Sequence, residues 1–274
     1  MDIGFFEVND WEVPIIQKHF PHAFISSEKL VAENAKKYKN LQVVSTFIYS
    51  QLNSSVLVQM PKLRCIATRS TGFDHVDAKY CARNNIVVCN VPRYGDRTVA
   101  EFTFALILSL TRRIYESVAL TRLGSFDNHG LTGMDLEHKT IGIIGLGKIG
   151  QEVAKIARAF NMKILAFNRS HDDTLAAELG LEYVELNELL KRSDVVTLHL
   201  PLLPTTTHFI NKNILTMKKG SYLINTARGG LVETQALIIG LHKGILAGVG
   251  LDVLEEESVL NEEAELISSE FRKK

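Results

Sequence analysis

A glycine motif near the middle of the chain has the spacing that binds the pyrophosphate of a dinucleotide. Gly145, Gly147 and Gly150 lie in the segment IGIIGLGKIG, after a run of β-branched residues and before a helix-like stretch. In such a turn the first glycine permits the tight bend, the second lets phosphates approach the backbone, and the third lets helix and strand pack closely. Free N–H groups at the helix N-terminus would bind the phosphates. The motif therefore predicts a dinucleotide site, with a ligand-free glycine turn as the alternative.

The position that usually binds the adenine ribose is not acidic in this chain. The second strand of the motif, KILAF, is followed by Asn168 and Arg169, where an Asp or Glu about 20 residues after the glycines is expected. An amide beside a cation does not repel a 2′-phosphate, which favours NADP(H). If Asn168 binds the ribose and Arg169 is solvated, NAD(H) is favoured. Both cofactors stay open.

Three charged residues follow the last two apolar runs. Arg228 lies in LINTARGGLV, and Asp252 and Glu257 lie in GLDVLEEE. Ligands of open α/β sheets bind just outside the carboxyl ends of the strands, and a guanidinium there matches a carboxylate in a bidentate way. Arg228 is therefore a candidate anion clamp. The alternatives are a surface charge for Arg228, a turn or N-cap for Asp252 and a solvated acidic run for Glu257.

The elements that must position these residues alternate between β-rich and helix-like segments. The β-rich runs cover residues 2–8, 42–48, 63–70, 86–91, 140–145, 163–167, 194–200, 221–227 and 246–253, with a weaker one near Tyr183. Their adjacent β-branched and aromatic residues are typical of strands covered on both faces. The pattern predicts an α/β fold of parallel βαβ units.

The periodicity of apolar residues predicts three longer helices. The first runs from Thr98 to about Thr121 as one helix, apolar nearly all round, as a helix wedged between two domains would be. The second covers 148–160, and the third is an amphipathic helix in the acidic tail 255–274.

Composition limits the classes of partner. The chain of 274 residues has 31 basic and 31 acidic residues, so no basic field would gather nucleic acid or anionic lipid. Its three cysteines form no metal-ligand spacing and predict reduced, mostly buried thiols. Without a secretory signal or a membrane-length apolar run, a cytoplasmic protein with a small-molecule partner and no metal is predicted.

Six motifs along the chain resemble those of the D-isomer-specific 2-hydroxyacid dehydrogenases, in particular the branch that contains D-lactate dehydrogenase. They are the glycine motif, SDVVTLHLPL, LINTARGGLV, GLDV and the upstream pair RSTGFDHVD and VPRYGDRTVAE. The resemblance implies two doubly wound parallel-sheet domains around a cleft: a flavodoxin-like substrate domain over 1–97 and a Rossmann cofactor domain over 98–274. It also implies a homodimer joined through the cofactor domain.

The resemblance assigns roles to individual positions. The substrate-binding arginine falls on Arg228 and the catalytic glutamate on Glu257, which in the family holds a histidine and raises its pKa. Substrate contacts fall on Thr71, Gly72 and Tyr94. Positions that contact the cofactor are Thr98, Gly145, Gly147, Lys148, Ile149, Gly150, Asn168, Arg169, Leu200, Pro201, Thr206, Thr226, Ala227, Arg228 and Asp252. The reaction implied is hydride transfer between the nicotinamide and a small 2-oxo or 2-hydroxy acid, with pyruvate and D-lactate as the first candidates.

The sequence departs from the family pattern at its end. In the family the catalytic histidine stands some thirty residues beyond the glutamate, whereas seventeen residues follow Glu257 and none is histidine. His75, His199, His208 and His242 offer no convincing replacement. We therefore expect a fragment of a longer enzyme, without the last strand and the C-terminal return segment, and an inactive chain.

Two other functions stay open at this stage. One is a non-catalytic protein of the same family that senses the ratio of NADH to NAD. The other is a different Rossmann protein, such as a methyltransferase, against which NTARGG and GLDV argue.

Overall fold

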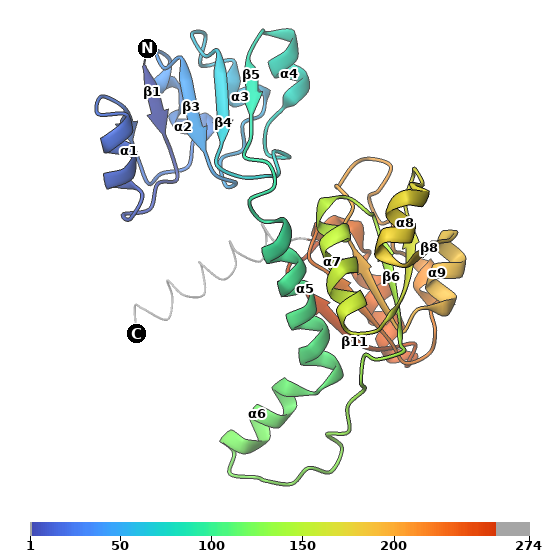
Figure 1. The fold of residues 1–274 in the computed structure, drawn as a ribbon. Helices are drawn as coiled ribbons and strands as arrows, with labels where there is room; N and C mark the ends of the chain where they lie inside the picture. Colours follow the sequence, from blue (N-terminus) through green and yellow to red (C-terminus); the bar gives the residue numbers. More distant parts are fainter. Residues whose placement is uncertain (1, 256–274) are drawn as a thin grey trace. The chain divides into compact units, whose positions relative to one another are not determined.

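The computed structural model describes residues 2–255 and forms two units, 1–95 and 96–274. Figure 1 shows a parallel sheet with its helices in each unit. The predicted tail helix, apart from Glu255, lies outside the described residues.

The first unit has a five-stranded parallel sheet in the order β2-β1-β3-β4-β5. Its strands are β1 (Ile3–Phe5), β2 (Phe24–Ile25), β3 (Val43–Thr46), β4 (Cys65–Thr68) and β5 (Val87–Cys89). Its helices are α1 (Val13–His19), α2 (Ala32–Ala35), the 3₁₀ helix η1 (Lys36–Tyr38), α3 (Ser54–Leu57) and α4 (Ala78–Arg83). Among the strands of this unit, β2 alone was not predicted, because two residues are too few to show a periodic pattern.

The core of the first unit lies mainly on one face of this sheet. Phe6, Leu52, Met60 and Ile66 are almost completely buried there. A smaller cluster around Phe5, Val8 and Ile16 packs α1 beside the strands. The predicted substrate loop follows β4, at the carboxyl end of this sheet.

The second unit has a six-stranded parallel sheet in the order β11-β10-β9-β6-β7-β8. Its strands are β6 (Thr140–Ile144), β7 (Lys163–Phe167), β8 (Leu181–Tyr183), β9 (Val195–Leu198), β10 (Ser221–Asn225) and β11 (Leu246–Leu251). The helices are α5 (Asp96–Thr111), α6 (Ile114–Arg122), α7 (Lys148–Ala159), α8 (Asp173–Leu179), α9 (Leu186–Arg192), α10 (Thr234–His242) and the 3₁₀ helices η2 (Lys212–Thr216) and η3 (Gly229–Leu231).

Alternate residues of these strands enter two cores, one on each face of the sheet. Ile141 and Ile143 join the cluster under α5 and α7, whereas Ile144 joins the cluster that includes residues of α9 and α10. The rings of Phe104 and Phe160 stack with their centroids 5.4 Å apart where α5 meets α7. The predicted α/β fold with two parallel sheets is thereby confirmed.

The single long helix predicted from Thr98 to Thr121 is wrong. The structure has two helices, α5 and α6, separated at Arg112 and Arg113, and Arg113 adopts a left-handed φ of 50°. The carbonyl oxygen of Thr111, which a continuing helix would use, accepts the N–H of Met134 at 2.8 Å. A contact with a segment some twenty residues away therefore ends α5.

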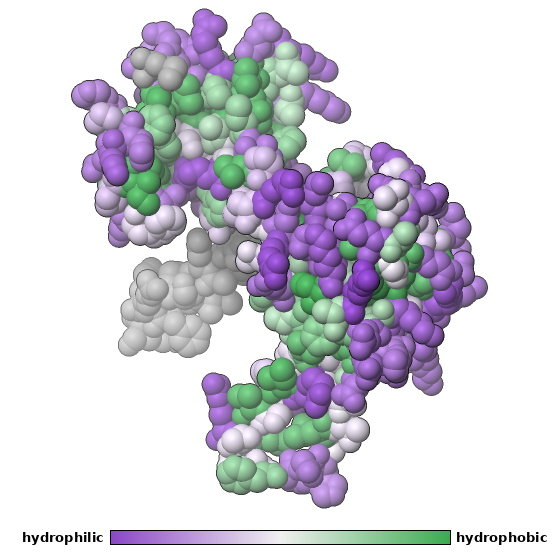
Figure 2. Space-filling model, in the orientation of Figure 1, coloured by the Kyte–Doolittle hydropathy of each residue, from purple (hydrophilic) through white to green (hydrophobic). Residues whose placement is uncertain are grey.

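The predicted burial of this segment on nearly all sides is wrong as well. Phe102 on α5 is 43% exposed, and α6 has no buried residue. In Figure 2 hydrophobic and hydrophilic residues are mixed over the surface of α6 and the loop that follows it.

Two further sequence-based expectations concern the cysteines and the membrane. All three cysteines are free thiols, but only Cys81 is buried, while Cys65 is half-buried and Cys89 is exposed. Burial, together with the neighbouring Cys89, raises the pKa of Cys65. Among residues 2–255, no helix has the length and apolar character that a membrane crossing needs.

Candidate active site

The glycine turn between β6 and α7 has the close packing that its three glycines predict. Gly145 adopts a φ of 95°, and a β-carbon there would lie 2.7 Å from the carbonyl oxygen of His199. A β-carbon on Gly150 would lie 2.2 Å from the carbonyl oxygen of Gly145. Both positions therefore exclude any side chain, and they hold the helix directly against the strand.

Gly147 differs from its two neighbours because it faces open space. No atom lies within 4 Å of the position that its β-carbon would occupy. Gly147 is also the N-cap of α7, and no side chain caps this end of the helix. The first N–H groups of a helix have no partner within it. These features fit a pyrophosphate that approaches the backbone at Gly147, with Lys148 and Ile149 in the first turn.

Asn168 links the end of β7 to the glycine turn. Its Oδ1 accepts the N–H of Leu146 at 3.1 Å, and its Nδ2 donates to the carbonyl oxygen of Ser170 at 2.7 Å. The neighbouring Arg169 is exposed. An amide and a guanidinium therefore follow this strand. Neither group repels a phosphate, whereas a carboxylate at this position would.

The loop after β10 is held by the side chain of Asn225. The Oδ1 of Asn225 accepts the N–H of Ala227 at 3.1 Å, and its Nδ2 donates to the carbonyl oxygen of Arg228 at 2.9 Å. Arg228 is exposed, and its Nη1 donates to the carbonyl oxygen of Ala227 at 2.8 Å. A buried amide thus fixes the backbone that carries the predicted anion clamp.

Asp252 follows β11 beside the same loop. Its N–H donates to the carbonyl oxygen of Asn225 at 3.0 Å, and its side chain is exposed. Glu257, the predicted catalytic glutamate, lies outside the described residues.

Three of the predicted cofactor positions form hydrogen bonds within the protein through a hydroxyl or a peptide group. The hydroxyl of Thr206 donates to the carbonyl oxygen of Pro201 at 2.7 Å and accepts the N–H of Leu203 at 2.8 Å. The hydroxyl of Thr226 bonds that of Thr103 on α5 at 3.0 Å. Both threonines are buried and stabilise the loops after β9 and β10, next to Leu200 and Ala227. Thr98 is exposed on the first turn of α5.

In the first unit, the predicted substrate loop follows β4. The hydroxyl of Thr71 donates to the carbonyl oxygen of Val91 at 3.0 Å, and the carbonyl oxygen of Gly72 accepts the hydroxyl of Ser70 at 2.7 Å. Tyr94 is 61% exposed. These contacts fix the loop and leave the ring of Tyr94 at the surface.

A buried polar network that the sequence did not reveal supports this edge of the first sheet. The carboxylate of Glu7 accepts the N–H groups of Ile48, Tyr49 and Ser50 at 2.8–2.9 Å. The guanidinium of Arg69 donates to the carbonyl oxygen of Glu7 at 2.9 Å and to that of Phe6 at 2.8 Å. Glu7 stands in no motif, and Arg69 is the first residue of RSTGFDHVD, to which the resemblance assigned no role.

A comparison with known protein families gives a match over more than half of the chain. Residues 104–270 match the family model described as "D-isomer specific 2-hydroxyacid dehydrogenase, NAD binding domain". The chain belongs to this family. The resemblance predicted from the sequence is thereby confirmed, and the glycine turn, Asn168 and the loops after β10 and β11 lie within the matched NAD-binding region.

Relatives of known name and structure agree with this assignment. The chain is 39% identical to a glyoxylate reductase of Thermococcus litoralis over 236 residues, which cover 83% of this chain and 71% of that protein. It resembles the crystal structure of D-lactate dehydrogenase from Aquifex aeolicus complexed with NAD and lactic acid, with a TM-score of 0.90 and 37% identity over 97% of this chain and 80% of that one. A pyruvate reductase of Chlamydomonas reinhardtii gives a TM-score of 0.83 and 35% identity, over 94% and 78% of the two chains.

The histidines of this family member take structural positions that the sequence alone did not separate. Burial lowers the pKa of His199 to about 3, so its imidazole is neutral near pH 7 and is no source of a proton. Its Nε2 lies 3.0 Å from the hydroxyl of Thr197. His208 bonds the carboxylate of Glu255. His242 ends α10, and the backbone of His75 binds that of Leu52 in the first unit.

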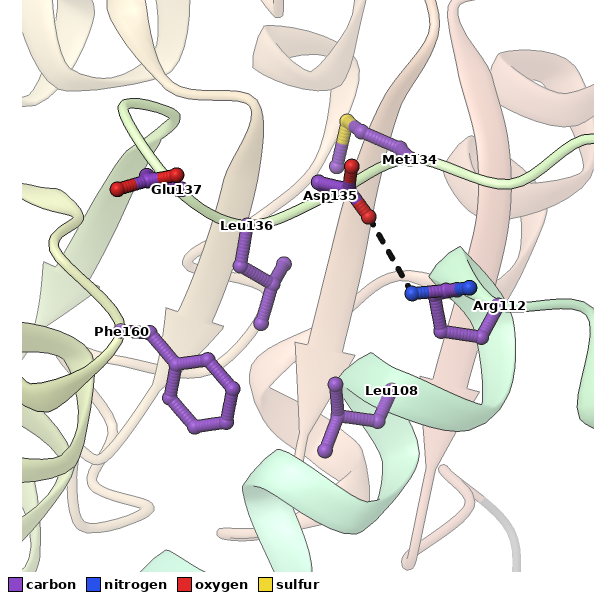
Figure 3. A pocket seen from close by; sticks show the side chains of 7 residues that line it. All are labelled: Leu108, Arg112, Met134, Asp135, Leu136, Glu137 and Phe160. Atoms are coloured by element: carbon purple, nitrogen blue, oxygen red, sulfur yellow. Dashed lines mark hydrogen bonds and ion pairs between the residues drawn. The ribbon is translucent and has the colours of Figure 1, made fainter.

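A surface pocket of about 270 Å³ lies at the opposite end of α7 from the glycine turn. Leu108, Leu136 and Phe160 line its apolar side, and Arg112 pairs with Asp135 at 3.2 Å across its rim (Figure 3). A helix of 12 residues separates it from the glycine turn by roughly 18 Å. This pocket is therefore not part of the predicted dinucleotide site. Within residues 2–255, no group of three or more His, Cys, Asp or Glu side chains is arranged to hold a metal ion.

Proposed function

We propose that this chain carries the cofactor and substrate sites of a dehydrogenase that transfers a hydride between a nicotinamide cofactor and a small 2-oxo or 2-hydroxy acid. The supporting observation is that the open glycine turn and the Arg228 loop lie at the carboxyl edge of one sheet. The strands that lead to them, β6 and β10, are separated by β9 alone, which corresponds to roughly 10 Å. This spacing suits one extended dinucleotide whose phosphates rest on α7 and whose nicotinamide reaches Arg228.

The residues would divide the chemistry between them. NAD(P)H supplies the hydride when it is bound. Arg228 clamps the substrate carboxylate in a bidentate way and polarises the 2-oxo group. As the family resemblance implies, the backbone amides of Thr71 and Gly72 would also contact the substrate carboxylate, and Tyr94 would be a further substrate contact. Asp252 would lie on the nicotinamide side. Glu257 would take the position that in the family holds the proton-donating histidine, but none of the seventeen residues after Glu257 is a histidine.

The cofactor would bind along the matched NAD-binding region. Gly145, Gly147, Lys148, Ile149 and Gly150 would hold the pyrophosphate. Leu200, Pro201, Thr206, Thr226 and Ala227 would supply backbone and apolar contacts, with Thr98 at the start of α5. The exposed guanidinium of Arg169 beside an amide at Asn168 supports NADP(H) as well as NAD(H).

The substrate that we test first is pyruvate, which gives D-lactate. The neighbour of TM-score 0.90 was crystallised with lactic acid, and another is a pyruvate reductase. Glyoxylate is the second candidate, because several relatives are glyoxylate reductases. Hydroxypyruvate and longer 2-oxo acids stay open.

We also propose the roles of the two domains and the homodimer that the family resemblance implies. Residues 1–97 would form the substrate domain and residues 98–274 the cofactor domain. The exposed apolar side chains of α6 and the following loop support a homodimer joined through the cofactor domain.

Binding and turnover are measured separately with the 274-residue chain. We expect NADH or NADPH to bind, as shown by quenching or enhancement of cofactor fluorescence, and oxamate, an unreactive pyruvate analogue, to bind the chain–cofactor complex. Arg228→Lys should weaken oxamate binding at least tenfold, because Lys cannot form the bidentate pair. Oxamate binding within twofold of wild type would contradict the assignment of Arg228.

The expectation of an inactive chain remains a prediction, and the same samples test it. Oxidation of NADH or NADPH with pyruvate and with glyoxylate is followed at 340 nm. Cofactor binding without turnover of any 2-oxo acid would favour the alternative, a non-catalytic NAD(H)-binding regulator. Turnover would exclude it.

A further inference from the structure

Glu255 connects the loops that follow three neighbouring strands of the second unit. We propose that Glu255, together with His208, is a positioning residue that holds the segment after β11 against the Arg228 loop. The inference rests on the proposed function, because it assigns the pair an effect on the binding of the 2-oxo acid.

The carboxylate of Glu255 binds the first residue of α10. Its Oε2 accepts the N–H of Thr234 at 2.8 Å and the hydroxyl of Thr234 at 2.6 Å. A carboxylate at the N-terminus of a helix satisfies a free N–H group and is favoured by the helix dipole. These bonds from Thr234, followed by the bond from His208, lower the pKa of Glu255. Glu255 is therefore charged at neutral pH and attached to the end of the Arg228 loop.

The other carboxylate oxygen of Glu255 pairs with Nε2 of His208, from the loop after β9. His208 is itself fixed to the Arg228 loop, because its N–H donates to the carbonyl oxygen of Gly230 at 2.9 Å. Two residues later, the N–H of Ile210 donates to the carbonyl oxygen of Leu231 at 3.0 Å, and the N–H of Glu233 donates back to Ile210 at 2.9 Å. The His208 loop and residues 230–233 thus form a short parallel ladder directly after Arg228.

The segment before Glu255 lies in direct contact with the same loop. A β-carbon on Gly229 would lie 1.9 Å from the carbonyl oxygen of Leu254 and 2.6 Å from the nitrogen of Glu255. Only glycine allows this approach. Glu255 thus fixes a peptide that already packs against Gly229, the neighbour of Arg228. Asp252 lies three residues before Glu255.

The position of Glu255 predicts that its loss affects binding of the 2-oxo acid and binding of the dinucleotide to different extents. The Arg228 loop carries the proposed carboxylate clamp, and a displacement of about 1 Å at such a site can cost on the order of 10²-fold. The glycine turn is held instead by β6, β7 and α7, through contacts such as that of Asn168 with Leu146. Loss of the Glu255 contacts should therefore weaken binding of the 2-oxo acid more than binding of the dinucleotide.

The experiment compares Glu255→Ala, Glu255→Gln, His208→Ala and the double variant Glu255→Ala with His208→Ala in the 274-residue chain, with Glu182→Gln as the matched control. Glu182 pairs with Arg192 at 2.8 Å on the surface at β8, so its variant loses an ion pair away from the site. We measure the Kd of the cofactor by fluorescence, the Kd of oxamate at saturating cofactor, and the amide hydrogen exchange of residues 226–234.

We expect Glu255→Ala to raise the Kd of oxamate about tenfold, with the cofactor Kd within about threefold and faster exchange over 226–234. Glu255→Gln keeps an acceptor for Thr234, so its affinity for oxamate should lie between those of Glu255→Ala and the wild type. His208→Ala should weaken oxamate binding less when Glu255 is already Ala, because the two residues act together. Glu182→Gln should change none of these values.

An unchanged Kd of oxamate in Glu255→Ala would overturn the positioning role. A parallel loss of oxamate binding, cofactor binding and thermal stability would also overturn it, because it would indicate a structural role alone. If the wild-type chain binds cofactor but no oxamate, the proposed substrate fails. Hydrogen exchange then decides the positioning role by itself: faster exchange over 226–234 in Glu255→Ala supports it, and unchanged exchange refutes it.

Discussion

The carbonyl oxygen of Gly145 lies 2.2 Å from the position that a β-carbon on Gly150 would occupy. No side chain fits there unless α7 moves away from β6. We therefore expect Gly150→Ala to destabilise the protein by about 3 kcal/mol, the upper range for overpacking, and to raise the Kd of NADH at least tenfold. Urea unfolding and fluorescence titration measure the two effects.

The matched variant for this prediction is Gly147→Ala in the same motif. The space around Gly147 is open, and its φ of −70° suits alanine. The free energy of unfolding should stay within about 0.5 kcal/mol of wild type, while the added methyl group weakens NADH binding at least tenfold. If Gly147→Ala binds NADH as wild type does, the pyrophosphate does not approach the backbone at this glycine.

The pH dependence of stability should report the burial of His199. Its pKa is about 3 in the folded protein and 6.5 in the unfolded chain, so the unfolded state binds the proton first as the pH falls. The contribution of neutral His199 is fully present above pH 6.5 and is lost progressively between pH 6.5 and 3. From pH 7 to pH 5 the loss amounts to about 2 kcal/mol.

Urea unfolding at pH 7 and pH 5 tests this for wild type and for His199→Gln. The difference between the two pH values should shrink by about 2 kcal/mol in the variant. The control is His138→Gln, because the side chain of His138 is 81% exposed and should not contribute. An equal pH difference in wild type and His199→Gln would show that another group causes the acid sensitivity.

The features that could be predicted from the sequence are those set by neighbours along the chain. The β-branched runs located every strand except β2, because buried parallel strands need continuous apolar residues. The glycine motif predicted the turn before α7, because Gly145 and Gly150 meet steric demands and Gly147 leaves the backbone open, all within six residues. The Arg228 loop could be placed at a strand end for the same reason.

The features that could not be predicted depend on contacts between distant segments. The break between α5 and α6 follows from the bond between Thr111 and Met134. The pair of His208 and Glu255 joins residues 47 positions apart, and no motif indicates that the two residues contact each other. Glu7 binds the N–H groups of a loop more than forty residues later. Residue type gives no signal for such pairs, because each of these side chains is also common on protein surfaces.

The choice between NADP(H) and NAD(H) should depend on Arg169. A guanidinium binds a 2′-phosphate strongly, and a carboxylate at the same position repels it. We expect Arg169→Asp to raise the Kd of NADPH at least tenfold and to change the Kd of NADH by less than about threefold. Fluorescence titration with both cofactors measures the shift.

Lys163→Asp is the control for Arg169→Asp, because Lys163 is exposed at the opposite end of the same strand and the charge change is equal. It should leave both affinities unchanged. If Arg169→Asp has no effect on NADPH, Arg169 is solvated, and Asn168 alone serves the ribose of NAD(H).

The exposed apolar residues of α6 and the following loop should join two copies of the chain. Tyr115 is 78% exposed, Leu123 83% and Phe126 88%. Exposed large apolar side chains that gather on one helix and its loop favour an interface. We expect the 30.6 kDa chain to sediment as a dimer at micromolar concentration, and the double variant Leu123→Asp with Phe126→Asp to sediment as a monomer, because each carboxylate would be buried without a partner.

Trp11→Asp provides the comparison for this double variant. Trp11 is 69% exposed but belongs to the first unit, so its variant should remain dimeric if the cofactor domain forms the interface. Dissociation by Trp11→Asp with an intact dimer in the double variant would place the interface on the first unit. A wild-type chain that sediments as a monomer at every concentration would refute the homodimer, and the apolar surface of α6 would then need another partner.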